Sequence, residues 1–247
     1  MTYCVAVRVA DGLVLLSDTR TNAGVDNVSR FSKMFTWERA GERAIGMATS
    51  GNLSITQGVI TRLEQAIERS AEDPHVETIL NAASMYRVAE LVGEAMQGLQ
   101  DRYRDSIQAE GAGADATILV CGQRKGGRHR LFMVYSAGNF VEATADTPYF
   151  QIGEHKYGKP ILDRVVQMET PLDEVAKAVC VSMDSTLHSN LSVGMPLDLA
   201  VLRRDRFAFQ VRERIEADDP RFQNISREWG GRLREAFLAM PDVVSIG

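Results

Sequence analysis

Four residue types that together could perform acyl transfer occur near the start of the chain. Thr2 is followed by a predicted strand, Asp18 ends a second predicted strand, and Lys33 lies fifteen residues after Asp18. Gly51 stands in a Ser-Gly-Asn sequence at a predicted junction between a strand and a helix. A threonine hydroxyl becomes a nucleophile when a base accepts its proton, and fixed charges and backbone N–H groups can stabilise the oxyanion that forms.

Each of these residues has a distinct role in that chemistry. A free α-amine on Thr2, with a reference pKa of about 7.7–8.0, is partly neutral near pH 7 and can accept the hydroxyl proton. Lys33 would stabilise the developing alkoxide, and Asp18 would keep the lysine protonated and oriented. The N–H of Gly51, where a helix begins, is a natural oxyanion donor. The mechanism requires removal of Met1, which we expect the small side chain of Thr2 to permit.

The elements that must position these residues can be predicted from periodicity and turn residues. Alternating side chains predict strands, and apolar residues at helical spacing predict helices. Asp11-Gly12 is typical of a two-residue hairpin turn between the first two strands. We expect strands at residues 3–10, 13–17, 34–38, 44–49, 116–120, 130–135, 148–152, 197–203 and 207–211, and helices at residues 53–70, 77–107, 160–167, 172–188 and 220–238.

The order of these elements indicates the fold class. Blocks of antiparallel hairpins alternate with pairs of helices, unlike the strand–helix alternation of a parallel sheet. Two antiparallel sheets packed face to face, with a pair of helices outside each, would use all the apolar faces. We therefore predict an α+β fold, a four-layer αββα sandwich. No linker-like stretch interrupts the chain, so we expect one domain over residues 1–247.

Composition excludes several other classes of protein. The 28 basic and 33 acidic residues give a net charge of −5 without a long run of one sign, which argues against nucleic acid as a partner. Cys4, Cys121 and Cys180 are scattered, so we expect neither a disulfide framework nor a metal site, and no cofactor. The amino terminus does not resemble a signal peptide, and no apolar run approaches the ~20 residues of a membrane span. We expect a cytoplasmic protein with no membrane partner.

The catalytic constellation resembles that of a known family. The segment TRTNAGVDN, after the predicted strand LVLLSD, resembles the Asp-Thr-Arg segment of proteasome β subunits, with Lys33 at the expected distance. The sequence MTYCV…LVLLSDTRTNAGVDN is similar to the bacterial family called Anbu, the ancestral β subunit. The resemblance covers essentially the whole chain. It implies an N-terminal-nucleophile hydrolase fold, self-assembly into a homo-oligomer, and a site of Thr2, Asp18 and Lys33 with Gly51 as the oxyanion amide.

The same resemblance implies further roles around the site. Thr21 and Asn22 would offer backbone groups to an extended peptide or amide substrate. Thr49 and Leu53 would help to line the first specificity pocket. Arg20, in the matched segment, is a candidate supporting residue.

Two parts of the family pattern are not matched. Proteasome β subunits carry a Gly-Ser-Gly near the nucleophile, whereas this chain has Glu154 between Gly153 and His155. A glutamate close to the α-amine would raise the pKa of that amine and lower hydrolysis at neutral pH; alternatively, Glu154 forms an ordinary salt bridge at the helix entrance. The late supporting Asp and Ser of the family fall within residues 184–194, where three residues compete for the roles: Asp184, Ser189 and Asn190.

Two other motifs suggest different chemistry. Residues 153–159, GEHKYGK, match the first seven positions of a phosphate-binding loop, but Pro160 stands where a Ser or Thr would bind magnesium, and such a site needs a parallel sheet. We therefore interpret that match as chance. Asp184 and His188 lie one helical turn apart, a spacing more typical of an ion pair or a helix cap than of two metal ligands.

The sequence thus predicts a self-assembling threonine peptidase or amidase, with any partner unfoldase left unidentified. Two alternatives remain open on the sequence alone. The chain could be a proteasome-like assembly or scaffold protein with weak catalysis, which the glutamate at position 154 favours. It could also be an amidase for a small metabolite.

Overall fold

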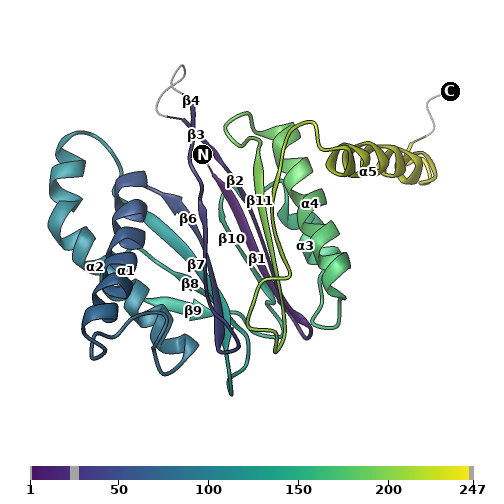
Figure 1. Ribbon diagram of the computed structural model, residues 1–247. Helices are drawn as coiled ribbons and strands as arrows, with labels where there is room; N and C mark the ends of the chain where they lie inside the picture. Colours follow the sequence, from purple (N-terminus) through teal and green to yellow (C-terminus); the bar gives the residue numbers. More distant parts are fainter. Residues whose placement is uncertain (1, 23–27, 245–247) are drawn as a thin grey trace.

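Two antiparallel sheets lie face to face in the structure, a computed structural model that describes residues 2–22 and 28–244 (Figure 1). Among these residues the first sheet has the strand order β10-β1-β2-β11-β12, the second has the order β5-β6-β7-β8-β9, and β3 and β4 form a separate ribbon. The strands are β1 (Tyr3–Val9), β2 (Gly12–Asp18), β3 (Arg20–Asn22), β4 (Val28–Arg30), β5 (Met34–Arg39), β6 (Arg43–Gly51), β7 (Ala116–Arg124), β8 (Arg130–Val134), β9 (Phe140–Glu142), β10 (Tyr149–Gly153), β11 (Leu197–Arg203) and β12 (Val211–Ile215).

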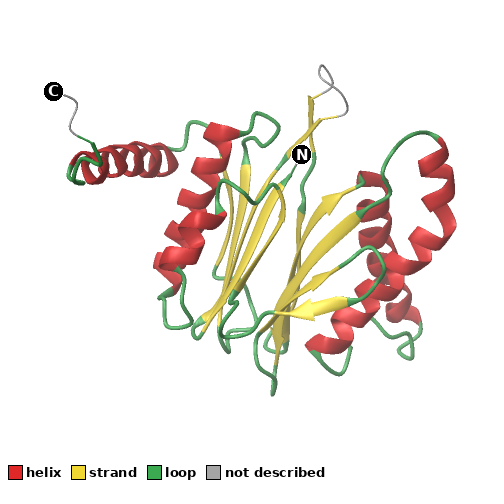
Figure 2. Cartoon of the chain, turned by 180° about the vertical axis from the view of Figure 1, so that it is seen from behind, coloured by secondary structure: helices red, strands yellow, loops and turns green. Residues whose placement is uncertain are grey.

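Helices cover the outer face of each sheet. The second sheet is covered by α1 (Leu53–Glu72) and α2 (Met85–Ala109), and the first by α3 (Lys159–Val165) and α4 (Leu172–Ser189) (Figures 1 and 2). The last helix, α5 (Pro220–Leu238), contacts α4 and then projects away from the sandwich (Figure 1). The predicted α+β architecture of two sheets between helix pairs is therefore confirmed.

Three apolar layers hold the sandwich together, and β1 shows how one strand serves two of them. Its side chains alternate between the faces of the sheet. Tyr3 and Val5 pack toward α3 and α4, whereas Cys4 and Ala6 pack between the two sheets. All four are fully buried, because a strand in the middle of a covered sandwich has no solvent face. The third apolar layer lies between the second sheet and its helices.

The prediction that the second long helix begins near residue 77 is wrong. The helix begins at Met85, where Ser84 caps it by accepting a hydrogen bond from the Arg87 N–H at 3.0 Å. The preceding segment forms turns, and the buried Arg43 guanidinium binds the carbonyl oxygens of Ile79 and Ala82. Those carbonyls satisfy a side chain from another element instead of a helical ladder, a contact that helical periodicity cannot reveal.

The prediction of a strand at residues 207–211 is also wrong. Asp205 and Phe207 have positive φ angles of 63° and 51°, and β12 begins only at Val211. The alternating Phe-Ala-Phe sequence belongs to a loop whose Phe209 packs against the layer between the sheets and donates its N–H to Glu38 Oε1 at 2.8 Å. A further difference is that the short strands β3, β4 and β9 were not predicted from the sequence.

Candidate active site

A buried ion pair between Asp18 and Lys33 forms the centre of the candidate site. Asp18 ends β2, and Lys33 immediately precedes β5 in the other sheet. Lys33 Nζ donates to Asp18 Oδ1 at 2.7 Å and to the Arg20 carbonyl oxygen at 2.6 Å. Both side chains are almost inaccessible to solvent. The pair therefore joins the two sheets at the end of the sandwich where the chain begins, close to the β3–β4 ribbon (Figure 1).

The electrostatic environment of Asp18 has opposing contributions. Burial raises the pKa of its carboxyl above the ordinary value, because the charged form is desolvated. The Lys33 ammonium acts in the opposite sense, as do two backbone N–H donors, Tyr3 to Oδ1 at 3.0 Å and Gly194 to Oδ2 at 3.3 Å. Because the net shift is upward, protonation of Asp18, and with it the loss of the ion pair, begins at a higher pH than for an exposed aspartate.

The backbone of Thr2 is held beside this ion pair. The Tyr3 N–H that binds Asp18 Oδ1 belongs to the same peptide group as the Thr2 carbonyl. That carbonyl oxygen accepts the N–H of Glu154 at 2.7 Å. Gly153 makes the approach feasible, because a Cβ there would lie 2.0 Å from the Thr2 oxygen and its φ is +81°. The ends of β2 and β10 thus clamp Thr2, which is itself half-buried.

Gly51 ends β6 and does not itself begin a helix, since Asn52 is the N-cap of α1. Gly51 has a φ of +105°, a conformation that favours glycine, and a Cβ there would lie 2.2 Å from the Asp115 carbonyl oxygen. The Asn52 N–H donates to that same oxygen at 2.8 Å, and the Thr49 N–H donates to the Lys33 carbonyl oxygen at 2.9 Å. Gly51 therefore lies two residues beyond the backbone group that holds Lys33.

The predicted substrate-binding residues surround this centre. Thr21 and Asn22 belong to β3, whose one edge pairs with β4 at Thr21–Ser29 and Asn22–Val28. Thr49 is buried, and its backbone and hydroxyl both donate to the Lys33 carbonyl oxygen. Leu53 is the first residue of α1 and is partly exposed.

Residues 190–196 form a loop that supports the ion pair from the first sheet. In addition to the Gly194 N–H bond to Asp18, the Gly194 carbonyl oxygen accepts the N–H of Thr19 at 3.4 Å. Arg20 Nη1 donates to the Leu191 carbonyl oxygen at 2.8 Å. A Cβ on Gly194 would lie 2.2 Å from Arg20 Nε, so the guanidinium lies against the glycine. Arg20 thus supports the site through this loop, and Gly194 is a contact that the sequence did not indicate.

Asn190 and Glu154 contact each other, whereas the other two late candidates lie elsewhere. Asn190 Nδ2 donates to Glu154 Oε2 at 3.0 Å, and the Lys156 N–H donates to Glu154 Oε1 at 3.1 Å. The buried Asp184 faces His188 on α4, at 3.5 Å, as an ion pair would require. Ser189 is exposed at the end of α4. Of the three late candidates, therefore, Asn190 is the residue that contacts the clamp around Thr2.

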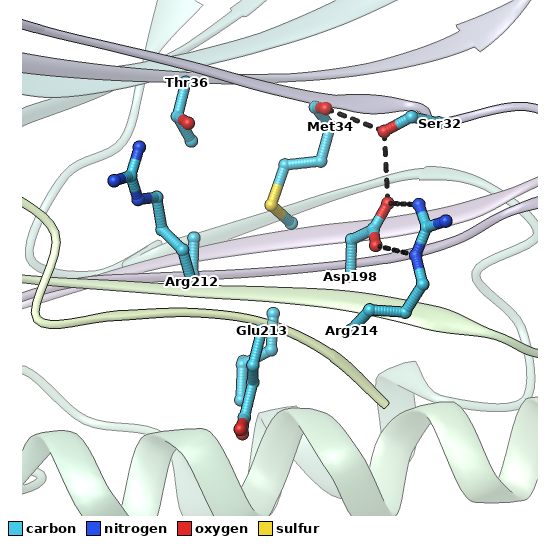
Figure 3. A pocket seen from close by; sticks show the side chains of 9 residues that line it. Ser32, Met34, Thr36, Asp198, Arg212, Glu213 and Arg214 are labelled. Atoms are coloured by element: carbon cyan, nitrogen blue, oxygen red, sulfur yellow. Dashed lines mark hydrogen bonds and ion pairs between the residues drawn. The ribbon is translucent and has the colours of Figure 1, made fainter. Parts of the chain in front are cut away.

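The segment that carries Lys33 is held by three polar residues that the sequence did not indicate. Ser32 Oγ donates to Asp198 Oδ2 at 3.1 Å and to the Met34 carbonyl oxygen at 2.9 Å. Arg214 binds both oxygens of Asp198, at 2.8 and 3.1 Å. Figure 3 shows this chain of contacts at one side of a cavity of about 260 Å³ between β5 and β12. It connects the edges of the two sheets directly beside Lys33.

Other kinds of site find little support. In the part of the chain that the structure describes, no three His, Cys, Asp or Glu side chains gather as metal ligands would. The GEHKYGK segment runs from β10, which pairs antiparallel with β1, into α3, so it lacks the parallel sheet of a nucleotide-binding loop. None of the described helices has the length and apolarity of a membrane span.

Comparison with known proteins identifies the family. A family model described as "Proteasome subunit" matches residues 2–202. The Anbu (ancestral beta-subunit) structure from Yersinia bercovieri is 44% identical over 99% of both chains, with a TM-score of 0.90. The chain belongs to the proteasome subunit family and to its Anbu proteins.

Two further Anbu structures agree with this assignment. The helical assembly of the Anbu complex from Pseudomonas aeruginosa contains a chain that is 43% identical over 98% of both chains, with a TM-score of 0.91. A Gly-1 mutant of Anbu from Hyphomicrobium sp. strain MC1 is 45% identical over 99% of this chain and 100% of that one, with a TM-score of 0.89. A search of curated proteins found no match. The Anbu structures cover α5, which lies beyond the residues matched by the family model.

Proposed function

We propose that this chain is a threonine peptidase or amidase that acts through the amino terminus of Thr2 after removal of Met1. One observation carries the proposal. One carboxylate oxygen, Asp18 Oδ1, accepts hydrogen bonds from both the Lys33 ammonium and the Tyr3 N–H. The peptide group that joins Thr2 to Tyr3 is therefore held beside the lysine. A structural salt bridge alone would not need the amino terminus beside it.

The proposed reaction proceeds through an acyl-enzyme. The α-amine of Thr2 accepts the hydroxyl proton while Oγ attacks the carbonyl carbon of an amide. The Gly51 N–H and the Lys33 ammonium stabilise the resulting oxyanion. The amine then passes the proton to the leaving nitrogen, the C–N bond breaks, and an ester forms on Thr2. Water hydrolyses the ester, which releases the acid and restores the hydroxyl.

The substrate would lie as an extended chain beside β3. Thr21 and Asn22 offer backbone groups there, and within the described strands only one edge of β3 is paired. Leu53, partly exposed at the start of α1, would contact the side chain next to the bond that is cleaved. Thr49 would line the floor of the same pocket while holding the Lys33 carbonyl.

We also propose that the protein works as a homo-oligomer. The support is the Pseudomonas aeruginosa relative, which was solved as a helical assembly and shares 43% of its residues over 98% of the chain. In such an assembly many copies of the Thr2 site would be brought together.

A second candidate function has a specific observation in its favour. Glu154 stands where the family has a serine near the nucleophile, and its carboxylate is held by Asn190 and the Lys156 N–H. A fixed carboxylate in place of a hydroxyl removes a proton carrier and favours a protonated amine. The alternative is therefore an assembly protein of the proteasome type with weak catalysis.

The test begins with protein whose loss of Met1 is verified by intact mass. Wild type, Thr2→Ala and Thr2→Ser are compared on panels of fluorogenic peptides and small amides. We expect hydrolysis by wild type, a reduced rate for Thr2→Ser and none for Thr2→Ala. Hydrolysis by Thr2→Ala at the wild-type rate would exclude Thr2 as the nucleophile.

A second readout separates a weak enzyme from a non-enzyme. An amine- and hydroxyl-reactive electrophile, such as an epoxyketone or a β-lactone, should add its mass to Thr2 of wild type and not to the Thr2→Ala variant. Labelling without turnover would favour the assembly protein with weak catalysis. Turnover restricted to small amides would favour the metabolite amidase.

A further inference from the structure

The side-chain hydroxyl of Tyr3 is buried where three elements meet. Tyr3 is fully buried in β1, and its ring packs toward α3 and α4. Its hydroxyl oxygen lies 2.6 Å from Ser182 Oγ of α4 and accepts a hydrogen bond from Gln151 Nε2 of β10, also at 2.6 Å. Figures 1 and 2 show β10 beside β1, with α3 and α4 over the outer face of their sheet. The hydroxyl therefore joins β1 to a neighbouring strand and to a helix.

Apolar packing does not account for this hydroxyl. A phenylalanine would fill the same space between β1 and the helices and would need no polar partner. A buried polar group is tolerated only when hydrogen bonds offset its loss of water, and here two other elements supply those bonds. Ser182 is itself fully buried. A satisfied network of this kind fixes the relative position of the elements that contribute to it.

The backbone of Tyr3 connects this network to the candidate active site. The Tyr3 N–H donates to Asp18 Oδ1 at 3.0 Å. The same peptide group carries the Thr2 carbonyl oxygen, which accepts the N–H of Glu154. Tyr3 is thus bound to the end of β2 through its backbone and to α4 and β10 through its side chain. A shift of the Tyr3 side chain would move Thr2, because the two residues are consecutive.

Gly158, the residue before α3, packs directly on the two hydroxyls. A Cβ there would lie 2.2 Å from Ser182 Oγ and 2.8 Å from the Tyr3 hydroxyl oxygen. Gly158 is buried, whereas residues 155–157 before it are exposed. The close approach to Tyr3 and Ser182 gives a structural reason for the second glycine of the GEHKYGK segment.

The start of the same loop contacts Thr2. Gly153 closely approaches the Thr2 carbonyl oxygen, and the Glu154 N–H donates to that oxygen at 2.7 Å. The loop at residues 153–158 is therefore held to Thr2 at its start and to Tyr3 at its end. Because Glu154 lies in this loop, both contacts determine where its carboxylate is placed.

We propose that Tyr3 is a positioning residue for the reaction at Thr2, through the hydrogen bonds of its side-chain hydroxyl with Ser182 and Gln151. These bonds hold β1 and the 153–158 loop in one arrangement, which fixes Thr2 between the loop and Asp18. The inference rests on the proposed function of Thr2 and adds a role for side chains outside the reacting groups. A displacement of about 1 Å at a reacting atom can lower a rate about 10²-fold, so a hydroxyl that fixes position can affect turnover.

The test compares Tyr3→Phe with Tyr149→Phe in the full chain. Each substitution removes a tyrosine hydroxyl from a hydrogen-bonded network, since the Tyr149 hydroxyl donates to Asp163 and accepts from Lys159. Tyr149 is paired with Val7, toward the other end of β1 from Tyr3. Both variants keep residue 2 unchanged, and loss of Met1 is verified by intact mass for each.

We expect Tyr3→Phe to lower kcat at least about tenfold and to leave KM within about twofold, because the nucleophile is displaced while the substrate contacts remain. Tyr149→Phe should leave both constants within about twofold. Ser182→Ala removes one partner and keeps the Tyr3 hydroxyl, so it should lower kcat by less than Tyr3→Phe does.

A second measurement does not depend on hydrolysis. Hydrogen–deuterium exchange of a peptide that covers residues 151–158 reports how firmly the loop is held. Exchange there should be at least about tenfold faster in Tyr3→Phe than in wild type, and unchanged in Tyr149→Phe. The thermal midpoints of the two variants should be similar, because each loses one hydroxyl from a network.

The possible results separate the positioning role from the proposed function. A wild type that neither hydrolyses an amide nor reacts with an epoxyketone or a β-lactone contradicts the proposed function. An active wild type whose Tyr3→Phe variant keeps the wild-type kcat overturns the positioning role alone. Equal loop exchange in wild type and Tyr3→Phe also overturns it, whether or not wild type is active. A loss of kcat by the same factor in Tyr149→Phe would show a general effect on stability and would overturn it as well.

Discussion

Strand β1 and helix α5 both carry a regular series of apolar residues, and the subunit covers only one of them. Tyr3 and Val5 of β1 are fully buried on one face of the sheet, and Cys4 and Ala6 on the other. Helix α5 buries Phe222 near its start and exposes the apolar side chains of its far half. Burial of apolar surface contributes about 25 cal/mol per Å² to the free energy of folding. The exposed apolar side chains of α5 make no such contribution in the isolated subunit.

The two regions differ in how many contacts the rest of the subunit makes with them. Around the amino terminus, four segments contact Thr2 or the Asp18–Lys33 pair. They are the end of β2, the end of β10, the residue before β5 and the loop at 190–196. These partners all come from the same chain. At the carboxyl end, the described part of the subunit leaves Leu233 and Phe237 of α5 exposed. The contacts of the candidate site therefore come from within the subunit, whereas the far half of α5 has no such cover.

The largest expected effect concerns the amino-terminal region as a unit. Thr2→Ala should lower hydrolysis by at least about 10³-fold, because the nucleophile is lost. Lys33→Ala alone should also lower it strongly. The double variant should be no slower than Thr2→Ala, since residues that act together give non-additive losses. Rates on the best fluorogenic substrate check this, and a further loss in the double variant would contradict a shared role.

The next effect compares the buried ion pair of the candidate site with an exposed ion pair on α5. Asp18→Asn should lower the free energy of unfolding by about 3–5 kcal/mol, because it leaves the Lys33 ammonium buried without a counter-charge. Glu228→Gln breaks an exposed i,i+4 pair with Arg232, at 3.6 Å. This substitution should change the free energy of unfolding by less than about 0.5 kcal/mol. Urea denaturation measures both. Equal losses would mean that the burial contrast between the two regions has no energetic consequence.

A smaller effect tests the charge beside the amino terminus. The fixed carboxylate of Glu154 should raise the pKa of the Thr2 amine, so hydrolysis should increase toward alkaline pH. Glu154→Gln keeps the shape and removes the charge, and Glu154→Ser restores the hydroxyl of the family pattern. Both should shift the midpoint of the pH–rate profile down by up to about one unit, which is up to about tenfold in the neutral amine at neutral pH. Profiles that coincide with wild type would show that Glu154 is only a structural partner of Asn190.

The same profile has an acid limb that depends on Asp18. Burial raises the pKa of this carboxyl, so protonation breaks the ion pair with Lys33 at a higher pH than for an exposed aspartate. Hydrolysis should therefore fall as the pH decreases through the raised pKa. The two Glu154 variants should leave this limb in place, which distinguishes it from the amine.

The smallest expected effect concerns the far half of α5. A Cβ at Gly230 or Gly231 would meet nothing within 4 Å in the described subunit. Gly230→Ala and Gly231→Ala should therefore each raise the free energy of unfolding by up to about 1 kcal/mol, because alanine favours a helix interior over glycine. Urea denaturation measures both variants, and a loss of stability in either one would show that a contact requires the glycine.

Much of the amino-terminal region was predictable from local patterns. Alternation in residues 3–10 predicted the two faces of β1, and Thr2, Asp18, Lys33 and Gly51 were recognisable from residue type, spacing and a family resemblance. The structure brings the Thr2 backbone, Asp18 and Lys33 together, and it places Gly51 at the end of the strand whose Thr49 holds the Lys33 carbonyl. Their roles in catalysis remain predictions that the Thr2 and Lys33 variants test.

Other contacts were decided only by the tertiary structure. The Gly194 N–H reaches Asp18 across 176 residues of sequence, and Ser32 reaches Asp198 across 166. Arg43 likewise draws the carbonyls of Ile79 and Ala82 out of a predicted helix. Periodicity reports which side of an element faces the core, because that choice is local. It does not report which distant polar group lies opposite, because the register between strands and the packing of loops decide that only after the sheets have formed.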